Sequence, residues 1–187
     1  MLSLAGERMI SFKQFLSKFS PAFDLRLGLW PLTDALLDDS RKRVLLEKDR
    51  QVGVTTMLSM FALYASVILD QEVLYLVPSN LHREEVNGKL TSIKLSYMNH
   101  KNYMKLLKCG PKIISGPGEC YGRSADLLII DELQAFNPRV LREAMPQVIA
   151  NPDLRVIAIA RYPMRASTVF DLHKEPEVLT RHTLDLI

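Results

Sequence analysis

The sequence predicts an α/β fold, in which a mainly parallel β-sheet is sandwiched by helices. Five short apolar runs alternate with segments that have the length and apolar spacing of helices. Most of these runs are apolar at consecutive positions, which is typical of strands that are covered on both faces. Several runs end in polar or glycine-containing turns. Ligands of parallel sheets bind at the carboxyl ends of the strands, so these turns are where we look for a site.

The length and composition favour one globular domain. The chain has 187 residues, 48% of them hydrophobic and 24% charged. The net charge of +3 permits contact with nucleic acid without requiring it. Cys109 and Cys120 fit no zinc spacing, so we expect two reduced thiols. The N-terminus lacks the apolar core of a signal peptide, and the apolar segment 57–69 is shorter than the about 20 residues that span a bilayer.

The elements follow in order along the chain. Apolar residues spaced by three and four predict an amphipathic helix over 7–19, which Ser20-Pro21 ends, and a short helix over 32–37. The apolar runs predict strands over 44–46, 73–77, 113–114, 127–130 and 156–159. Between them, helices are predicted over 55–70, over 81–107 with a break, and over 139–149. Ser79 or Asn80 is expected to cap the helix that begins near 81.

The turn after the first strand has features of a phosphate-binding loop. Residues 45–56 read LLEKDRQVGVTT, an apolar run followed by a short turn and an apolar helix. Such a turn directs backbone N–H groups, at the positive end of the helix dipole, toward a phosphate. Against the pattern G-x-x-x-x-G-K-[ST], Gly53 is the second glycine and Thr55 the hydroxyl residue. Val54 occupies the lysine position and Lys48 the first glycine position.

A second pattern ends the strand predicted over 127–130, where Asp131 and Glu132 follow four apolar residues. At a strand tip the first carboxylate could complete a Mg²⁺ shell together with Thr55, and the second could polarise a water for attack on a γ-phosphate. Strands also end in polar turns by chance. The acids follow the glycine-threonine loop in the order that a nucleotide site requires, and this favours the functional interpretation.

Together these motifs resemble the ATPase domain of large terminase subunits, the DNA-packaging motors of tailed bacteriophages and herpesviruses. The resemblance is carried by R-Q-x-G-x-[ST]-T after a strand, by L-L-I-I-D-E on a later strand with Y-G-R-S-A-D before it, and by a further strand that ends near a proline. A stretch of small residues and Phe, 166–170, follows. The likeness covers about residues 30–170. It implies a P-loop NTPase of the RecA-like, ASCE type, with a helical N-terminal segment over 1–40 and the P-loop core over 41–175.

The resemblance also implies roles for individual residues. Thr55 and Asp131 would bind the Mg²⁺ that accompanies ATP, and Glu132 would be the general base. Arg50 would approach the phosphates, while 160–163 would couple hydrolysis to movement. The nucleotide-binding loop would consist of Lys48, Asp49, Arg50, Gln51, Val52, Gly53, Val54, Thr55 and Thr56. Trp30 and Leu32 lie where a segment that packs on adenine would be expected.

Two departures from the family pattern stand out. Val54 replaces the usual lysine, and some terminases, the lambda type among them, are similar in carrying the lysine at the start of the loop. Lys48 stands at that position, so we expect it to reach back over the loop as a third catalytic residue. The alternative is that Lys48 is an exposed turn lysine and the site binds ATP poorly. The nuclease domain of full terminases is absent, so the chain is expected to be an isolated ATPase domain.

The partners that the resemblance implies are double-stranded DNA, a portal protein and a small terminase subunit. The chain would be a monomer in solution and a homo-oligomeric ring on the procapsid, in the cytoplasm of an infected host cell and without membrane contact. A neighbouring subunit would supply an arginine chosen from Arg123, Arg139, Arg142, Arg161 and Arg165, with Arg123 and Arg139, which flank the acidic strand, as the first choices. Between Glu85 and Glu119 no acidic residue occurs, and this stretch is a candidate DNA contact: its basic and aromatic residues are Lys89, Lys94, Tyr97, His100, Lys101, Tyr103, Lys105, Lys108 and Lys112.

Two other functions remain open on the sequence. A helicase-like DNA-dependent ATPase would have the same sheet and the same motifs at the ends of the strands. A degenerate P-loop fold, with Val54 as its mark, would bind or scaffold without hydrolysing ATP.

Overall fold

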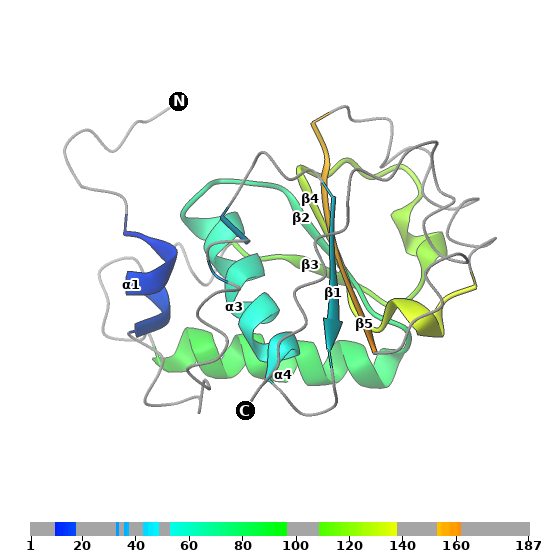
Figure 1. Ribbon diagram of the computed structural model, residues 1–187, viewed down its shortest axis with the longest axis horizontal. Coiled ribbons are helices and arrows are strands. Elements are labelled where there is room, and N and C mark those ends of the chain that lie inside the picture. Colours follow the sequence, from blue (N-terminus) through cyan, green and yellow to red (C-terminus); the bar gives the residue numbers. More distant parts are fainter. Residues whose placement is uncertain are drawn as a thin grey trace.

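The fold is a five-stranded, all-parallel β-sheet flanked by helices, with the strand order β1-β5-β4-β2-β3 (Figure 1). The computed structural model describes residues 10–17, 33, 36–37, 43–48, 53–96, 109–137 and 153–161. This arrangement of strands and helices confirms the predicted α/β class and the predicted parallel sheet. A predicted helix over 139–149 lies outside the described residues, as do most of the N-terminal segment and everything after Arg161.

Each strand coincides with or overlaps one of the five apolar runs. The strands are β1 (Arg43–Lys48), β2 (Val73–Leu76), β3 (Lys112–Ile114), β4 (Leu127–Ile130) and β5 (Arg155–Arg161). Every residue of β2 and of β4 is buried. The two strands are adjacent in the middle of the sheet and covered on both faces, which explains why their apolar residues do not alternate with polar ones.

The α-helices with described bounds are α1 (Phe12–Ser17), α3 (Val54–Val67) and α4 (Asn80–Ser96), and the 3₁₀ turns are η2 (Pro117–Cys120) and η3 (Leu133–Ala135). Residues 33, 36 and 37 are also helical, as predicted for 32–37. The prediction that the first helix begins near residue 7 was wrong, because Ser11 starts α1 with a capping box. The Ser11 hydroxyl accepts from Gln14 N–H, and the Gln14 side chain accepts from Ser11 N–H. Ser79 caps α4 by accepting from His82 N–H.

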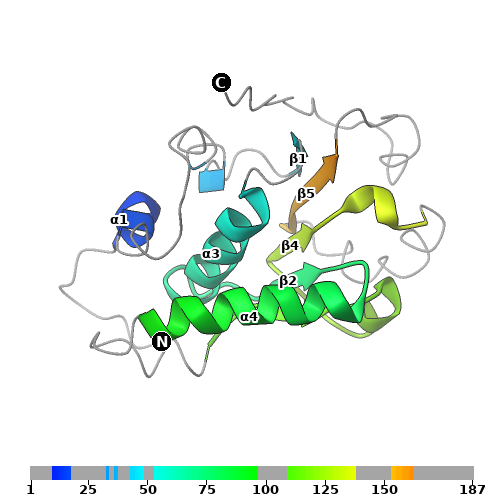
Figure 2. The same ribbon diagram turned by 90° about the horizontal axis from the view of Figure 1, so that it is seen from below.

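The strand order determines which face each connection covers. The steps from β1 to β2 and from β2 to β3 run in the same direction across the sheet, so their right-handed crossovers, α3 and α4, lie on one face. The steps from β3 to β4 and from β4 to β5 run back, so η2 and η3 belong to the opposite face. Figure 2, seen from below, shows α3 and α4 together on one side of the strands.

Two clusters of buried side chains, one on each face of the sheet, form the core. Alternate residues of β4 divide between them, with Leu127 and Ile129 on the α3 face and Leu128 and Ile130 on the other. The same holds for β5, where Ile157 and Ile159 lie on the α3 face. This alternation assigns a face to the polar residues that follow the strands.

Three aromatic side chains pack α1 against α3. The ring of Phe12 lies 5.2 Å from that of Phe61 and 5.1 Å from that of Tyr64, measured between centroids. All three rings are buried.

We expect Phe12→Ala to lower the free energy of unfolding by about 3–5 kcal/mol, because it removes a buried ring and leaves a cavity. Chemical denaturation measures the change. The matched control is Leu81→Ala, since Leu81 is 74% exposed and its truncation should change stability by less than about 0.5 kcal/mol. Equal stability of the two variants would contradict the packing described for α1.

Among the helices of the described residues, none has the length and apolarity needed to cross a membrane. Cys109 and Cys120 are both free thiols, and burial raises the pKa of Cys120 to about 11.

Candidate functional site

At the junction between β1 and α3 the structure describes Gly53, the residue directly before the helix. Gly53 precedes α3 in the left-handed conformation, with φ 80° and ψ 5°, which glycine adopts at little cost. Its carbonyl accepts from Met57 N–H at 3.0 Å and closes the first turn of the helix. Gly53 has no side chain that could cap this turn, and the N–H groups of a helix start are the donors that bind anions.

The predicted nucleotide-binding residues are only partly described. Lys48 is the last residue of β1 and pairs with Arg161, the last residue of β5. The side chain of Lys48 lies outside the described residues, and so do Asp49, Arg50, Gln51 and Val52. Val54 is fully buried against the core, whereas Thr55 and Thr56 beside it are half-buried.

Asp131 lies directly after β4 and continues the strand by one hydrogen bond, which its N–H donates to Leu76 O at 2.9 Å. Strand alternation puts Asp131 on the same face as Leu127 and Ile129, the face that α3 covers. The residue is only 3% exposed. A carboxylate buried this far requires hydrogen-bond partners or a cation to offset its desolvation.

One partner of Asp131 is Tyr75, a fully buried residue of β2. The Tyr75 hydroxyl donates to Asp131 Oδ2 at 3.3 Å. Burial raises the pKa of Tyr75 well above its ordinary value, the charge of Asp131 raises it further, and the neighbouring Ser59 side chain lowers it. The hydroxyl therefore stays protonated and acts as a donor at neutral pH.

Ser59 connects this pair to the start of α3. Ser59 is fully buried, and its hydroxyl donates to Thr55 O at 2.8 Å. Residues four apart lie on the same side of a helix, so Thr55 and Ser59 share one side of α3. The contacts of Ser59 and Tyr75 thus bring the first turns of α3 and Asp131 to the same face of the sheet, at the carboxyl ends of the strands.

Glu132, the second predicted acid, has an unusual backbone. Its φ of 52° and ψ of 51° are left-handed, a conformation that costs a non-glycine residue about 1–2 kcal/mol. Glu132 is the N-cap residue of η3, and Ala135 N–H donates to its carbonyl at 2.8 Å. Its half-buried carboxylate also accepts from the Gln134 side chain. Backbone strain of this kind is common at functional sites.

A second charged group lies at the end of β3. Arg83 of α4 donates to both carboxylate oxygens of Glu119, at 2.7 and 2.5 Å, and this hydrogen bonding lowers the pKa of Glu119. Glu119 also accepts from the N–H and the hydroxyl of Ser115. These bonds hold the glycine-containing turn 115–118 against α4, so the turn has a packing role that the sequence did not reveal.

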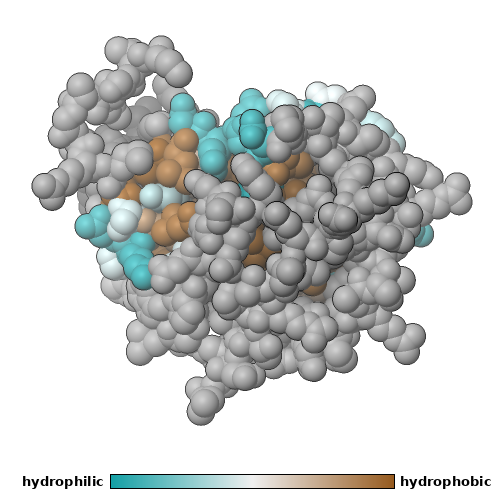
Figure 3. Space-filling model, turned by 45° about the horizontal axis from the view of Figure 1, so that its top comes forward, coloured by the Kyte–Doolittle hydropathy of each residue, from teal (hydrophilic) through white to brown (hydrophobic). Residues whose placement is uncertain are grey.

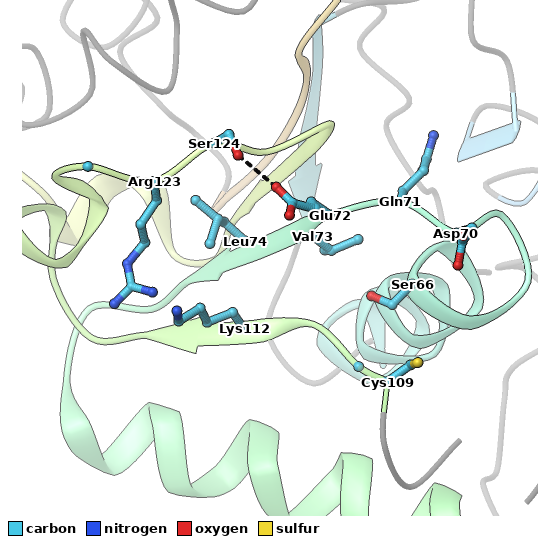
Figure 4. A pocket seen from close by; sticks show the side chains of 12 residues that line it. Ser66, Asp70, Gln71, Glu72, Val73, Leu74, Cys109, Lys112, Arg123 and Ser124 are labelled. Atoms are coloured by element: carbon cyan, nitrogen blue, oxygen red, sulfur yellow. Dashed lines mark hydrogen bonds between the residues drawn. The ribbon is translucent and has the colours of Figure 1, made fainter. Parts of the chain in front are cut away.

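A cavity of about 550 Å³ opens at the opposite end of the sheet, where the strands begin. Figure 4 shows Lys112 and Arg123 on one side of it and Asp70 on the other, with Ser124 hydrogen-bonded to Glu72. Seen from this end of the molecule, hydrophilic and hydrophobic residues are mixed (Figure 3). Gly53, Asp131 and Glu132 are not among the residues that line this cavity, so it is separate from the candidate site.

Sequence reasoning missed Tyr75 and Ser59. Tyr75 stands inside an apolar run, where a tyrosine is usually a core residue. Only the pairing of β2 with β4 brings its hydroxyl to Asp131. Ser59 follows Thr55 by four residues, and this spacing was the one available signal for it.

No protein-family model matches the sequence, and a search of curated proteins found no match.

Proposed function

We propose that the chain is the ATP-hydrolysing motor domain of a large terminase subunit, which drives double-stranded DNA into a procapsid. The observation that carries the proposal is a pair of hydrogen bonds, Ser59 to Thr55 O and Tyr75 to Asp131, together with the position of Ser59 beside Tyr75. It joins, at one edge of a parallel sheet, the two sequence motifs that a nucleotide site needs.

The strand order adds support. β5 lies between β1 and β4, so its last residue, Arg161, lies between the strand that precedes the proposed phosphate loop and the strand that precedes the acids. A strand in this position is typical of the RecA-like, ASCE type of P-loop fold. A segment at this point could detect the γ-phosphate and couple its loss to movement. Of the candidate arginines, Arg161 ends β5 at this edge, whereas Arg123 borders the cavity at the other end.

The oxygen ligands fit magnesium that arrives with a nucleotide. Mg²⁺ is usually bound by one or two carboxylates while phosphate oxygens and water complete its shell. Asp131 supplies a carboxylate on the α3 face, and Thr55 supplies a hydroxyl from the first turn of that helix. When bound, the metal would neutralise charge on the phosphates. Glu132 would accept a proton from the attacking water.

One observation favours the rival function, a non-hydrolysing binding module. Val54 is completely buried at the position where phosphate loops usually carry a lysine. Unless another cation replaces that lysine, the β- and γ-phosphates lose a strong partner. Lys48 is our candidate for this replacement.

The decisive experiment measures ATP binding with and without Mg²⁺ by calorimetry, and then ATP turnover with and without double-stranded DNA. The motor proposal requires Mg²⁺-dependent binding and turnover that double-stranded DNA accelerates. Stronger stimulation by single-stranded DNA would favour a helicase-like ATPase. Binding without turnover would favour the non-hydrolysing module, and absence of binding would overturn all nucleotide proposals.

We expect Lys48→Ala to lower ATP turnover by about 10²-fold or more, because it removes a cation that stabilises charge in the transition state. The matched control is Lys89→Ala, since Lys89 pairs with Glu85 on α4 at 2.6 Å and should not affect turnover. Steady-state phosphate release measures both. Unchanged turnover in Lys48→Ala would rule out the replacement role.

The proposed DNA contact rests on fewer lysines than the sequence suggested. Within the described part of the basic stretch, Lys89 is paired, and partial burial lowers the pKa of Lys94. Lys101, Lys105 and Lys108 lie outside the described residues. If these lysines track the backbone of DNA, affinity should fall steeply with salt and show no base preference.

A further inference from the structure

Tyr75 occupies a buried position that only polar chemistry explains. Its hydroxyl lies in the core between β2, β4 and α3, where a phenylalanine would fill nearly the same volume. Tyr75 and Ser59 are fully buried and Asp131 is 3% exposed. The hydroxyl donates to Asp131 Oδ2 at 3.3 Å, and Ser59 in turn donates to Thr55 O.

We propose that Tyr75 is a positioning residue, which orients the carboxylate of Asp131 so that its second oxygen can bind the metal ion of the nucleotide. The inference rests on the proposed function and deepens it, because it assigns part of the metal site to β2, a strand that carries no nucleotide motif.

The geometry of a carboxylate explains how the Tyr75 hydroxyl can orient it. Rotation about the last bond of an aspartate side chain is broad, so a carboxylate at a strand tip has no fixed plane of its own. A hydrogen bond to Oδ2 fixes that plane and the direction of Oδ1. Because Tyr75 is fully buried, its hydroxyl can hold this direction before any ligand binds.

Ser59 extends the same control to α3. Its hydroxyl lies beside Tyr75 and bonds the carbonyl of Thr55, the residue that supplies the other proposed metal ligand. Two buried side chains, Ser59 and Tyr75, therefore fix the positions of the two proposed metal ligands relative to each other. A shift of the first turn of α3 would be transmitted to Asp131 through these contacts.

The test compares Tyr75→Phe with Tyr64→Phe in the full chain. Tyr64 is the matched control, because it is also buried and its hydroxyl donates to Ile10 O at 3.0 Å, beside α1. The probe is Mn²⁺, whose binding is followed by electron paramagnetic resonance in the presence of a non-hydrolysable ATP analogue. Analogue binding in EDTA and thermal unfolding are recorded for the same samples.

We expect Tyr75→Phe to weaken Mn²⁺ binding by about 10-fold or more, the usual effect of losing a hydrogen bond to a metal ligand. Analogue binding in EDTA should not change. Tyr64→Phe should leave Mn²⁺ binding as in the wild type. A purely structural tyrosine would lower the unfolding temperature without a specific change in metal affinity, and that result would overturn the proposal.

A second pair of variants covers the case in which Tyr75→Phe does not fold. Ser59→Ala and Ser66→Ala each remove a hydroxyl that donates to a carbonyl one turn earlier in α3, but only Ser59 lies beside Tyr75. Weaker Mn²⁺ binding in Ser59→Ala alone would support the proposal. Equal binding in the two serine variants would contradict it.

The variant Asp131→Asn distinguishes failure of the positioning role of Tyr75 from failure of the proposed function. If the wild type binds Mn²⁺ with the analogue and Asp131→Asn does not, the proposed site stands. Unchanged binding by Tyr75→Phe would then overturn the positioning role alone. If the wild type binds neither Mn²⁺ nor the analogue, the proposed function fails, and the inference fails with it.

Discussion

Glu132→Gln is expected to lower ATP turnover by about 10²–10⁴-fold, the range for loss of a general base. Glutamine has nearly the same shape but cannot accept the proton of the attacking water. ATP binding should persist, because in the proposed site the turn at Gly53, Thr55 and Asp131 would hold the phosphates and the metal. Single-turnover hydrolysis and calorimetry of the same protein separate the two effects.

The matched control for this substitution is Glu84→Gln, which changes an exposed acid of α4. It should hydrolyse ATP as the wild type does. If Glu132→Gln retained normal turnover while the wild type depended on Mg²⁺, the base would have to be another residue, although the nucleotide site would remain. Loss of ATP binding in Glu132→Gln would instead indicate that this carboxylate helps to hold the ligand.

Asp131→Asn is expected to have opposite effects on activity and on stability. Turnover should fall by about 10²-fold or more, because metal binding supplies several kcal/mol of transition-state stabilisation. The nucleotide-free protein should be at least as stable as the wild type. A buried amide costs less to desolvate than a buried carboxylate, and the amide oxygen can still accept from Tyr75.

Phosphate release and thermal unfolding measure the two effects. Asp126→Asn is the control, since Asp126 is an exposed acid at the other end of β4 whose Oδ2 accepts from Glu72 N–H at 2.8 Å. It should lose a little stability and no turnover. Strong destabilisation by Asp131→Asn would mean that the carboxylate is held chiefly to support the fold.

The sequence predicted the elements of the fold better than their arrangement. Strands such as β2 and β4 are visible because burial on both faces requires consecutive apolar residues. The start of α1 was misjudged because the apolar spacing extends N-terminal to the helix, whereas the Ser11–Gln14 capping box determines where the helix begins. The order of the strands could not be predicted, since β2 and β4 look alike in sequence and only packing distinguishes their neighbours.

The residues of the candidate site also differ in how far the sequence could predict them. Asp131 and Glu132 could be predicted because charged residues directly after an apolar strand stand out along the chain. Tyr75 could not, because it belongs to a different strand and its hydroxyl is surrounded in sequence by apolar residues. The left-handed backbone of Glu132 was also hidden, since no glycine or asparagine marks the turn.

The enclosed side chain of Val54 bears on where such a loop could carry its cation. A lysine at this position would have to carry its ammonium group out of a space that the hydrophobic core now fills, at a large cost in desolvation. A Val54→Lys substitution is therefore expected to destabilise the protein before it adds a cation to the loop. If this loop binds phosphate, its cation has to come from another position in the turn.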